Sequence, residues 1–165
     1  MIKNMLIPWI LGTLSLVYTY RINKDYLRID LKAIKSFLIF MAWVTIFRAV
    51  LFLFSSSPME GILHLINPWF MLGVFWEDAV FVLPLIVLKE EKNISKPLYY
   101  ILFAISTIAF VSGHLYQGLI GLTSAIYIYA SAKYGKKFGF GTVMICHILY
   151  DLITYFGALI YVGGK

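Results

Sequence analysis

Two pairs of side chains that can carry chemistry stand four residues apart in the C-terminal half of the chain. Phe110 and His114 bound the segment FVSGH, and His147 and Asp151 bound the segment HILYD. Residues at this spacing lie on the same face of an α-helix, so each pair points in one direction. Imidazole and carboxyl groups transfer protons and bind metals. The two pairs are therefore candidates for one functional site.

Two adjacent acids, Glu77 and Asp78, precede both pairs. Consecutive helical residues diverge by about 100°, so the two acids cannot face the same point. We expect one acid to be chemical and the other to be supporting. Arg48 lies in an earlier apolar run, and we expect it to pair with Asp78 and support helix packing.

The composition predicts a membrane protein. The 165 residues are 61% hydrophobic and 18% aromatic, only 13% are charged, and the mean hydropathy is +0.85. A soluble domain has a different balance, and the apolar runs are too continuous for a transmembrane β-barrel. The net charge of +6 comes from residues in short connections, so it predicts topology rather than nucleic-acid binding. An aspartate at the centre of a membrane helix costs about 2.5 to 3.5 kcal/mol, so those within the runs need a reason to be there.

Six apolar runs predict an all-α bundle of about six transmembrane helices in one domain, residues 1–165. The runs are 5–20, 35–54, 69–88, 98–116, 118–132 and 140–162. The first run lacks a signal-peptide cleavage pattern, so we expect a retained span. Pro84 should kink the third run or loosen its hydrogen bonding. His64 is interpreted as an interfacial loop residue, and Cys146 as a small core residue rather than a nucleophile.

The charged connections predict the orientation of the chain. Lysines and arginines gather in residues 21–34, 89–97 and 133–139, whereas residues 55–68 contain neither. The positive-inside rule then places the three basic connections in the cytoplasm and both termini outside. We expect a multi-pass protein of a cell membrane, and the small size favours a prokaryotic one. The oligomeric state is not predicted.

The three motifs together resemble those of the CAAX-protease and bacteriocin-processing (CPBP or Abi) family of glutamic-type intramembrane proteases. That family has two adjacent acids, then Phe-x-x-x-His, then His-x-x-x-Asn or Asp. The matching residues, in the same order, are Glu77-Asp78, Phe110 to His114 and His147 to Asp151. The resemblance covers residues from about 69 to 155. It implies a four-helix catalytic core within residues 69–162, preceded by two additional spans and an external loop within residues 1–68.

The resemblance implies an endopeptidase that uses water and needs no cofactor or metal. Glu77 would take a proton from water with help from His114, because a desolvated carboxylate is a stronger base than an exposed one. His147 would stabilise the oxyanion. Asp151 would accept a hydrogen bond from His147 and fix its tautomer, or stay protonated and donate. The substrate would be a peptide or a membrane-associated protein, such as a prenylated C-terminus or a leader peptide.

Two positions depart from the family pattern. Val82 stands where the family usually has an arginine, and Asp78 stands where it commonly has a glutamate. Arg48 is a candidate for the missing support.

Three other functions use the same residues. The first is metal-dependent hydrolysis, since both histidines and the acids are competent ligands. The second is a non-catalytic immunity or scaffold protein that holds a partner. The third is a proton-coupled carrier, which the absence of paired broken helices makes less attractive.

Overall fold

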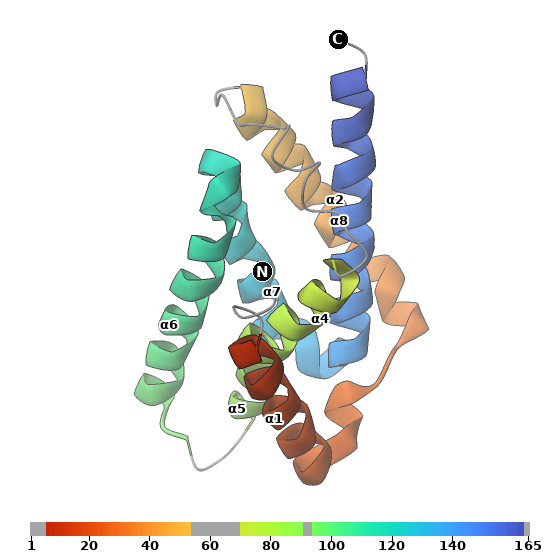
Figure 1. Ribbon diagram of the computed structural model, residues 1–165. Helices are drawn as coiled ribbons and strands as arrows, with labels where there is room; N and C mark the ends of the chain where they lie inside the picture. The colour runs from red at the N-terminus through yellow and green to blue at the C-terminus, as the bar shows by residue number, and fades with distance from the viewer. Residues whose placement is uncertain (1–5, 54–69, 91–93, 164–165) are drawn as a thin grey trace.

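The computed structural model describes residues 6–53, 70–90 and 94–163, and these residues are helical almost throughout with no strand among them. The all-α prediction is therefore confirmed for the described chain (Figure 1). The elements in order are α1 (Leu6–Asn23), the 3₁₀ helix η2 (Lys24–Leu27), α2 (Leu31–Leu53), α4 (Phe70–Phe81), α5 (Leu83–Leu88), α6 (Lys96–His114), the 3₁₀ segment η3 (Leu115–Thr123), α7 (Ser124–Phe138) and α8 (Phe140–Gly163). His64 and the connection 55–68 lie outside the described residues.

The sequence suggested that the fifth apolar run begins as an α-helix at residue 118, but the structure has no α-helix there. Gly118 has φ 64° and ψ −144°, a conformation outside the helical region that glycine adopts without a steric penalty. The chain from Leu115 to Thr123 is therefore a kinked 3₁₀ connection, and α7 begins only at Ser124. The 15 residues of α7 are fewer than the roughly 20 that a straight span requires.

The third apolar run is interrupted where Pro84 predicted an interruption. It divides at Val82 into α4 and α5, and Pro84 lies in the first turn of α5, where its missing N–H is tolerated. A neighbouring helix helps to satisfy the backbone at the break, since the Ser106 hydroxyl donates to the Phe81 carbonyl oxygen at 2.8 Å. Hydroxyl side chains commonly do this beside prolines in membrane helices.

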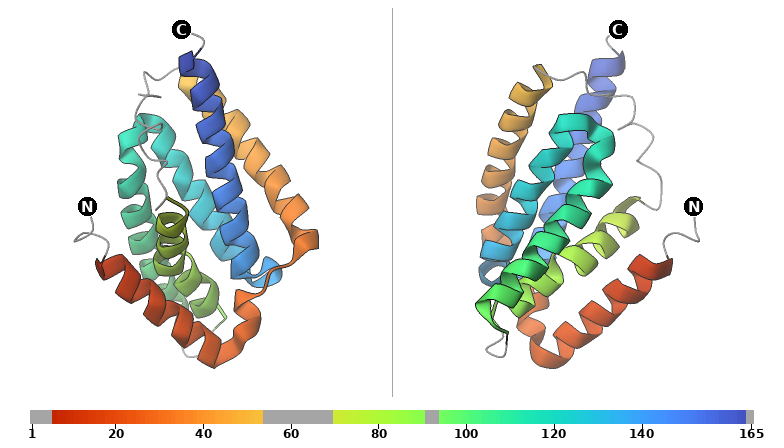
Figure 2. Two further views of the ribbon diagram at one scale, coloured as in Figure 1. Left: turned by 45° about the vertical axis from the view of Figure 1, so that its right-hand side comes forward. Right: turned by 90° about the vertical axis from the view of Figure 1, so that its left-hand side faces the viewer.

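The helices form an obliquely packed bundle (Figure 2). α1 lies along α4, α2 lies against α8, and α5 packs against α7. Leu83, Ile86, Ile128 and Val143 are at most 1% exposed and form the centre of the core. Glycine permits the close approach of α1 to α4, because a Cβ at Gly12 would lie 2.6 Å from the Trp76 ring.

The three basic connections meet at one end of the bundle, the lower end in Figure 1. Arg28 donates to the carbonyl oxygens of Lys136 and Lys137, at 3.0 and 2.6 Å, near the C-terminus of α7. Lys136 forms a 2.6 Å ion pair with Glu90, which follows α5. Cations are favourable at a helix C-terminus, where carbonyl groups lack helical partners. The charge pattern of the sequence predicted that these connections lie on one side of a membrane, and in the structure they lie at one end of the bundle.

Two of the described helices are long and apolar enough to cross a bilayer: α6 (Lys96–His114) and residues Phe140–Gly157 of α8. By length and composition alone this is weak evidence for a membrane location. The 12-residue α4 and the 15-residue α7 are too short to be straight full-length spans by themselves. Several helices nevertheless expose large apolar side chains, including Trp43 and Ile108, each 67% exposed.

Enlarging Gly12 should separate α1 from α4. We expect Gly12→Leu to lower the free energy of unfolding by about 1–3 kcal/mol, because the rigid Trp76 ring occupies the space. Gly157→Leu on α8 is the matched control, since a Cβ there meets no atom within 4 Å. Denaturant unfolding in detergent measures both, and equal stability of the two variants would contradict the packing.

Candidate active site

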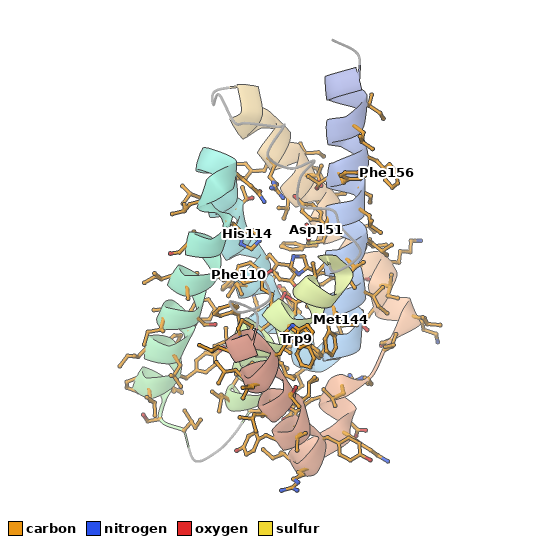
Figure 3. All side chains as sticks on the ribbon, in the orientation of Figure 1. Trp9, Phe110, His114, Met144, Asp151 and Phe156 are labelled. Atoms are coloured by element: carbon orange, nitrogen blue, oxygen red, sulfur yellow. The ribbon has the colours of Figure 1, made fainter. Side chains whose placement is uncertain are left out.

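The predicted site residues come together from three helices. Glu77 lies on α4, His114 is the last residue of α6, and His147 and Asp151 lie one turn apart on α8. Figure 3 shows the side chains of Phe110 and His114 on α6, and of Asp151 on α8, in the space between these helices. The four-residue spacing within α6 and α8 therefore acts as the sequence suggested, by placing both members of each pair on one face.

Glu77 and His114 are neighbours without a direct hydrogen bond. Glu77 Oε1 lies 3.9 Å from His114 Nδ1, and their side chains are 29% and 16% exposed. His114 Nδ1 instead donates to the Phe110 carbonyl oxygen at 2.8 Å. The His114 ring stacks on Phe110 with ring centres 4.5 Å apart. Phe110 thus orients the histidine through both its backbone and its ring.

Asp78 is the residue that orients His147. Its side chain is fully buried, and His147 Nδ1 donates to it with distances of 3.0 and 3.1 Å to the two carboxylate oxygens. The Tyr127 hydroxyl, on α7, donates to Asp78 Oδ2 at 2.9 Å. The Tyr127 and His147 rings also lie 4.3 Å apart. The two adjacent acids therefore face different helices, as helix geometry required.

Asp151 does not fix the His147 tautomer, contrary to one of the two roles expected for it. Asp151 Oδ2 lies 3.5 Å from His147 Nε2, which is longer than a normal hydrogen bond. Since Asp78 already accepts from Nδ1, the ring is held from the other side. Asp151 instead lies on the Nε2 side of the ring, and both residues line the cavity.

Arg48 does not pair with Asp78, so this prediction was wrong. Its guanidinium donates to the Tyr150 hydroxyl at 2.6 Å and to the Gln117 side-chain oxygen. Asp78 is satisfied by Tyr127 and His147. Arg48 therefore does not replace the arginine that the family usually has at position 82.

Val82 itself is fully buried, at the break between α4 and α5. An arginine at this position would have to place its charge in the apolar core, where a charged group is costly. The chain supports its acid pair in another way, through the hydrogen bond from Tyr127 to Asp78.

A small cavity of about 30 Å³ opens beside the histidines, with room for a water molecule or two. Its lining includes His114, His147, Asp151 and Arg48. Glu77 was expected to face this cavity, but none of the described residues that line it comes from α4. Glu77 reaches His114 from α4, so it adjoins the cavity through the histidine rather than forming its wall.

Sequence reasoning missed three polar residues of the site: Tyr127, Gln117 and Tyr150. Each lies in an apolar stretch where a tyrosine or glutamine has no distinctive spacing. The only available signal was general, since a buried tyrosine hydroxyl usually has a hydrogen-bond partner. Which partner it has depends on tertiary packing.

Cys146 is a buried free cysteine, as expected for a core residue.

Within the described ranges, no group of three or more His, Cys, Asp and Glu side chains is placed to hold a metal ion. The four candidate residues nevertheless have the donor chemistry of a zinc site, and the response of activity to a chelator tests metal dependence.

Comparisons of the chain with protein-family models, with curated proteins and with solved structures give no match. The resemblance to the CPBP family therefore rests on the three sequence motifs.

Removing the Tyr127 hydroxyl should destabilise the fold. Tyr127→Phe leaves the buried Asp78 carboxyl group with one partner fewer, and we expect a loss of about 1–3 kcal/mol in the free energy of unfolding. Tyr129→Phe is the control, since Tyr129 lies on the same helix and is 53% exposed. Denaturant titration in detergent compares the two, and an unchanged Tyr127→Phe protein would argue against the buried hydrogen bond.

Proposed function

We propose that the chain is an intramembrane endopeptidase of the glutamic type, similar to the CPBP proteases. Its substrate would be a peptide or a membrane-associated protein. One observation carries the proposal: His114, His147 and Asp151 line a small cavity, Glu77 lies 3.9 Å from His114, and a separate buried acid, Asp78, holds the His147 ring. A base, a water-sized space and an oriented hydrogen-bond donor are the minimum needed to hydrolyse an amide.

The proposed location is a cell membrane that the chain crosses about six times, with the four-helix core in residues 69–162. The apolar composition, the two long apolar helices and the exposed apolar side chains support it. The third crossing is formed by α4 and α5 together, with a break at Val82. The fifth is formed by the short α7 together with the 3₁₀ segment before it.

Glu77 is the proposed general base. The 3.9 Å between Glu77 Oε1 and His114 Nδ1 is too long for a hydrogen bond, and Nδ1–H already donates to the Phe110 carbonyl oxygen, so the water is proposed to bind Glu77 beside the His114 ring. The water oxygen attacks the carbonyl carbon of the peptide bond while Glu77 takes the proton. Glu77 then returns this proton to the departing amine nitrogen as the C–N bond breaks. His114, held by Phe110, positions the water.

His147 is the proposed oxyanion donor. In the doubly protonated ring, Nδ1–H is held by Asp78 and Nε2–H points toward Asp151 and the cavity. A positioned donor of this kind stabilises the tetrahedral intermediate and is typically worth about 3–4 kcal/mol. Asp78 and Tyr127 act as positioning residues, because they touch the ring of His147 or its partner rather than the substrate.

Glu77→Gln tests the mechanism. It preserves size and hydrogen bonding but removes the base, so cleavage should fall by about 10² to 10⁴ while stability stays nearly unchanged. Glu90→Gln is the control, since Glu90 pairs with Lys136 at the basic end of the bundle. Purified variants are assayed on a quenched-fluorescent membrane peptide, and their thermal unfolding is recorded in parallel.

Each alternative function predicts a different outcome of this assay. Full proteolysis by a well-folded Glu77→Gln protein would eliminate the glutamic mechanism. Loss of wild-type cleavage in a chelator, restored by zinc, would indicate a metal-dependent hydrolase. No cleavage by the wild type, with partner binding retained in Glu77→Gln, would indicate an immunity or scaffold protein. Coupled proton and solute uptake in vesicles would indicate a carrier.

The proposed orientation is tested by cysteine labelling in a Cys146→Ala background. A cysteine at Lys136, whose side chain is 57% exposed at the basic end, should be protected from an impermeant thiol reagent added to intact cells. A cysteine at Ser56 should react. Permeabilised cells, in which both sites should react, are the control. The reverse labelling pattern in intact cells would overturn the orientation.

A further inference from the structure

Arg48 is a charged residue that lines the cavity but has no part in the hydrolytic mechanism. It comes from α2, outside the region that resembles the CPBP family, yet it lines the same cavity as His147 and Asp151. Its side chain is partly buried. A guanidinium inside a membrane protein is costly, so such residues typically pair with other groups or mark a substrate pathway.

The hydrogen bonds of Arg48 leave its charge without an opposite partner in direct contact. Both acceptors, the Tyr150 hydroxyl and the Gln117 side-chain oxygen, are neutral. The guanidinium also lies 5.3 Å from the centre of the Tyr150 ring. Among the described residues, no carboxylate lies within ion-pair distance of Arg48. Arginine has five N–H donors, and these two bonds use two of them.

Asp151 lines the same cavity but forms no ion pair with Arg48. Asp151 interacts electrostatically with Arg48, but its carboxylate faces His147 Nε2 at 3.5 Å. The guanidinium fork is therefore held in place by Tyr150 and Gln117, beside the space that a substrate would enter. A planar fork of this kind matches a carboxylate, which it binds through two parallel hydrogen bonds.

We propose that Arg48 binds a carboxylate of the peptide substrate and so selects the bond to be cleaved. This inference rests on the proposed function. The carboxylate is either the C-terminus of the peptide or an acidic side chain. Because Arg48 and His147 share one small cavity wall, the scissile bond lies close to this carboxylate in the sequence of the substrate. The two sources of carboxylate have the same chemistry, and the choice of peptides distinguishes them.

The test uses three versions of a short labelled alanine–leucine peptide: one with a free C-terminus, one with a C-terminal amide, and one with the amide and an internal glutamate. Binding is measured to purified Glu77→Gln protein, with and without Arg48→Gln. At least one acidic peptide should bind roughly 10- to 100-fold more tightly than the plain amide, since a hydrogen-bonded charge pair typically contributes that much. Arg48→Gln should remove this preference and leave binding of the plain amide unchanged.

A second variant keeps Arg48 and fills its subsite. In Gln117→Glu, the new carboxylate stands where Arg48 already donates, so it should neutralise the guanidinium and abolish the preference for acidic peptides. Thr45→Val on α2 is the control, because the Thr45 hydroxyl donates within its own helix, to the Met41 carbonyl oxygen, and its removal leaves the guanidinium and both of its acceptors in place. It should keep the preference. Thermal unfolding verifies that each variant is folded.

Binding separates this inference from the proposed function. If the wild type cleaves no peptide, the proposed function fails. The binding preference still tests whether Arg48 binds a carboxylate. Equal binding of all three peptides to Glu77→Gln protein overturns the inference even if the wild type is an active protease. Tighter binding of an alkyl phosphate than of either acidic peptide, lost in Arg48→Gln, would assign Arg48 to a lipid headgroup and also overturn it.

Discussion

The buried carboxyl group of Asp78 constrains the arrangement of the bundle more than any other group. It is completely shielded from solvent, and a buried carboxyl group without hydrogen bonds costs several kcal/mol. Its partners come from two other helices, the Tyr127 hydroxyl on α7 and the His147 ring on α8. The rings of Tyr127 and His147 also pack against each other. α4, α7 and α8 can therefore approach only in the register that satisfies all three groups.

The break at Val82 places this carboxyl group where α4 ends. The Val82 amide donates to the Asp78 carbonyl oxygen at 2.9 Å, so the acid pair stands in the last turns of α4. Beyond it, α5 begins at Leu83 with Pro84 in its first turn, and its buried face packs against α7. The Ser106 hydroxyl of α6 donates to the carbonyl oxygen of Phe81. Without this break, the residues of α5 would continue along the axis of α4 and would meet α7 differently. The interruption thus connects the site to the packing of three neighbouring helices.

Most helices could be predicted from the sequence, but the contacts between them could not. Continuous apolar runs determine where α1, α2, α6 and α8 lie, and Pro84 determines the break in the third run. The 3₁₀ segment before α7 was missed, because Gly118 alone does not reveal its backbone angles. The convergence of Glu77 with His114 and of His147 with Asp151 followed from spacing and motif order. The partners of Asp78 did not, because Tyr127 and His147 lie 49 and 69 residues away and their contacts depend on how far each helix shifts along its neighbour.

The two adjacent acids illustrate how one short sequence provides two different environments. The proposed base must exchange protons with water and substrate, and Glu77 remains 29% exposed beside His114. An orienting acid must hold one geometry, and Asp78 is fully enclosed by partners that fix both of its oxygens. The rotation of about 100° between consecutive helical residues creates this difference without any loop. One turn after Asp78 the chain has the buried Val82, and the donor to Asp78 comes instead from another helix, as the Tyr127 hydroxyl.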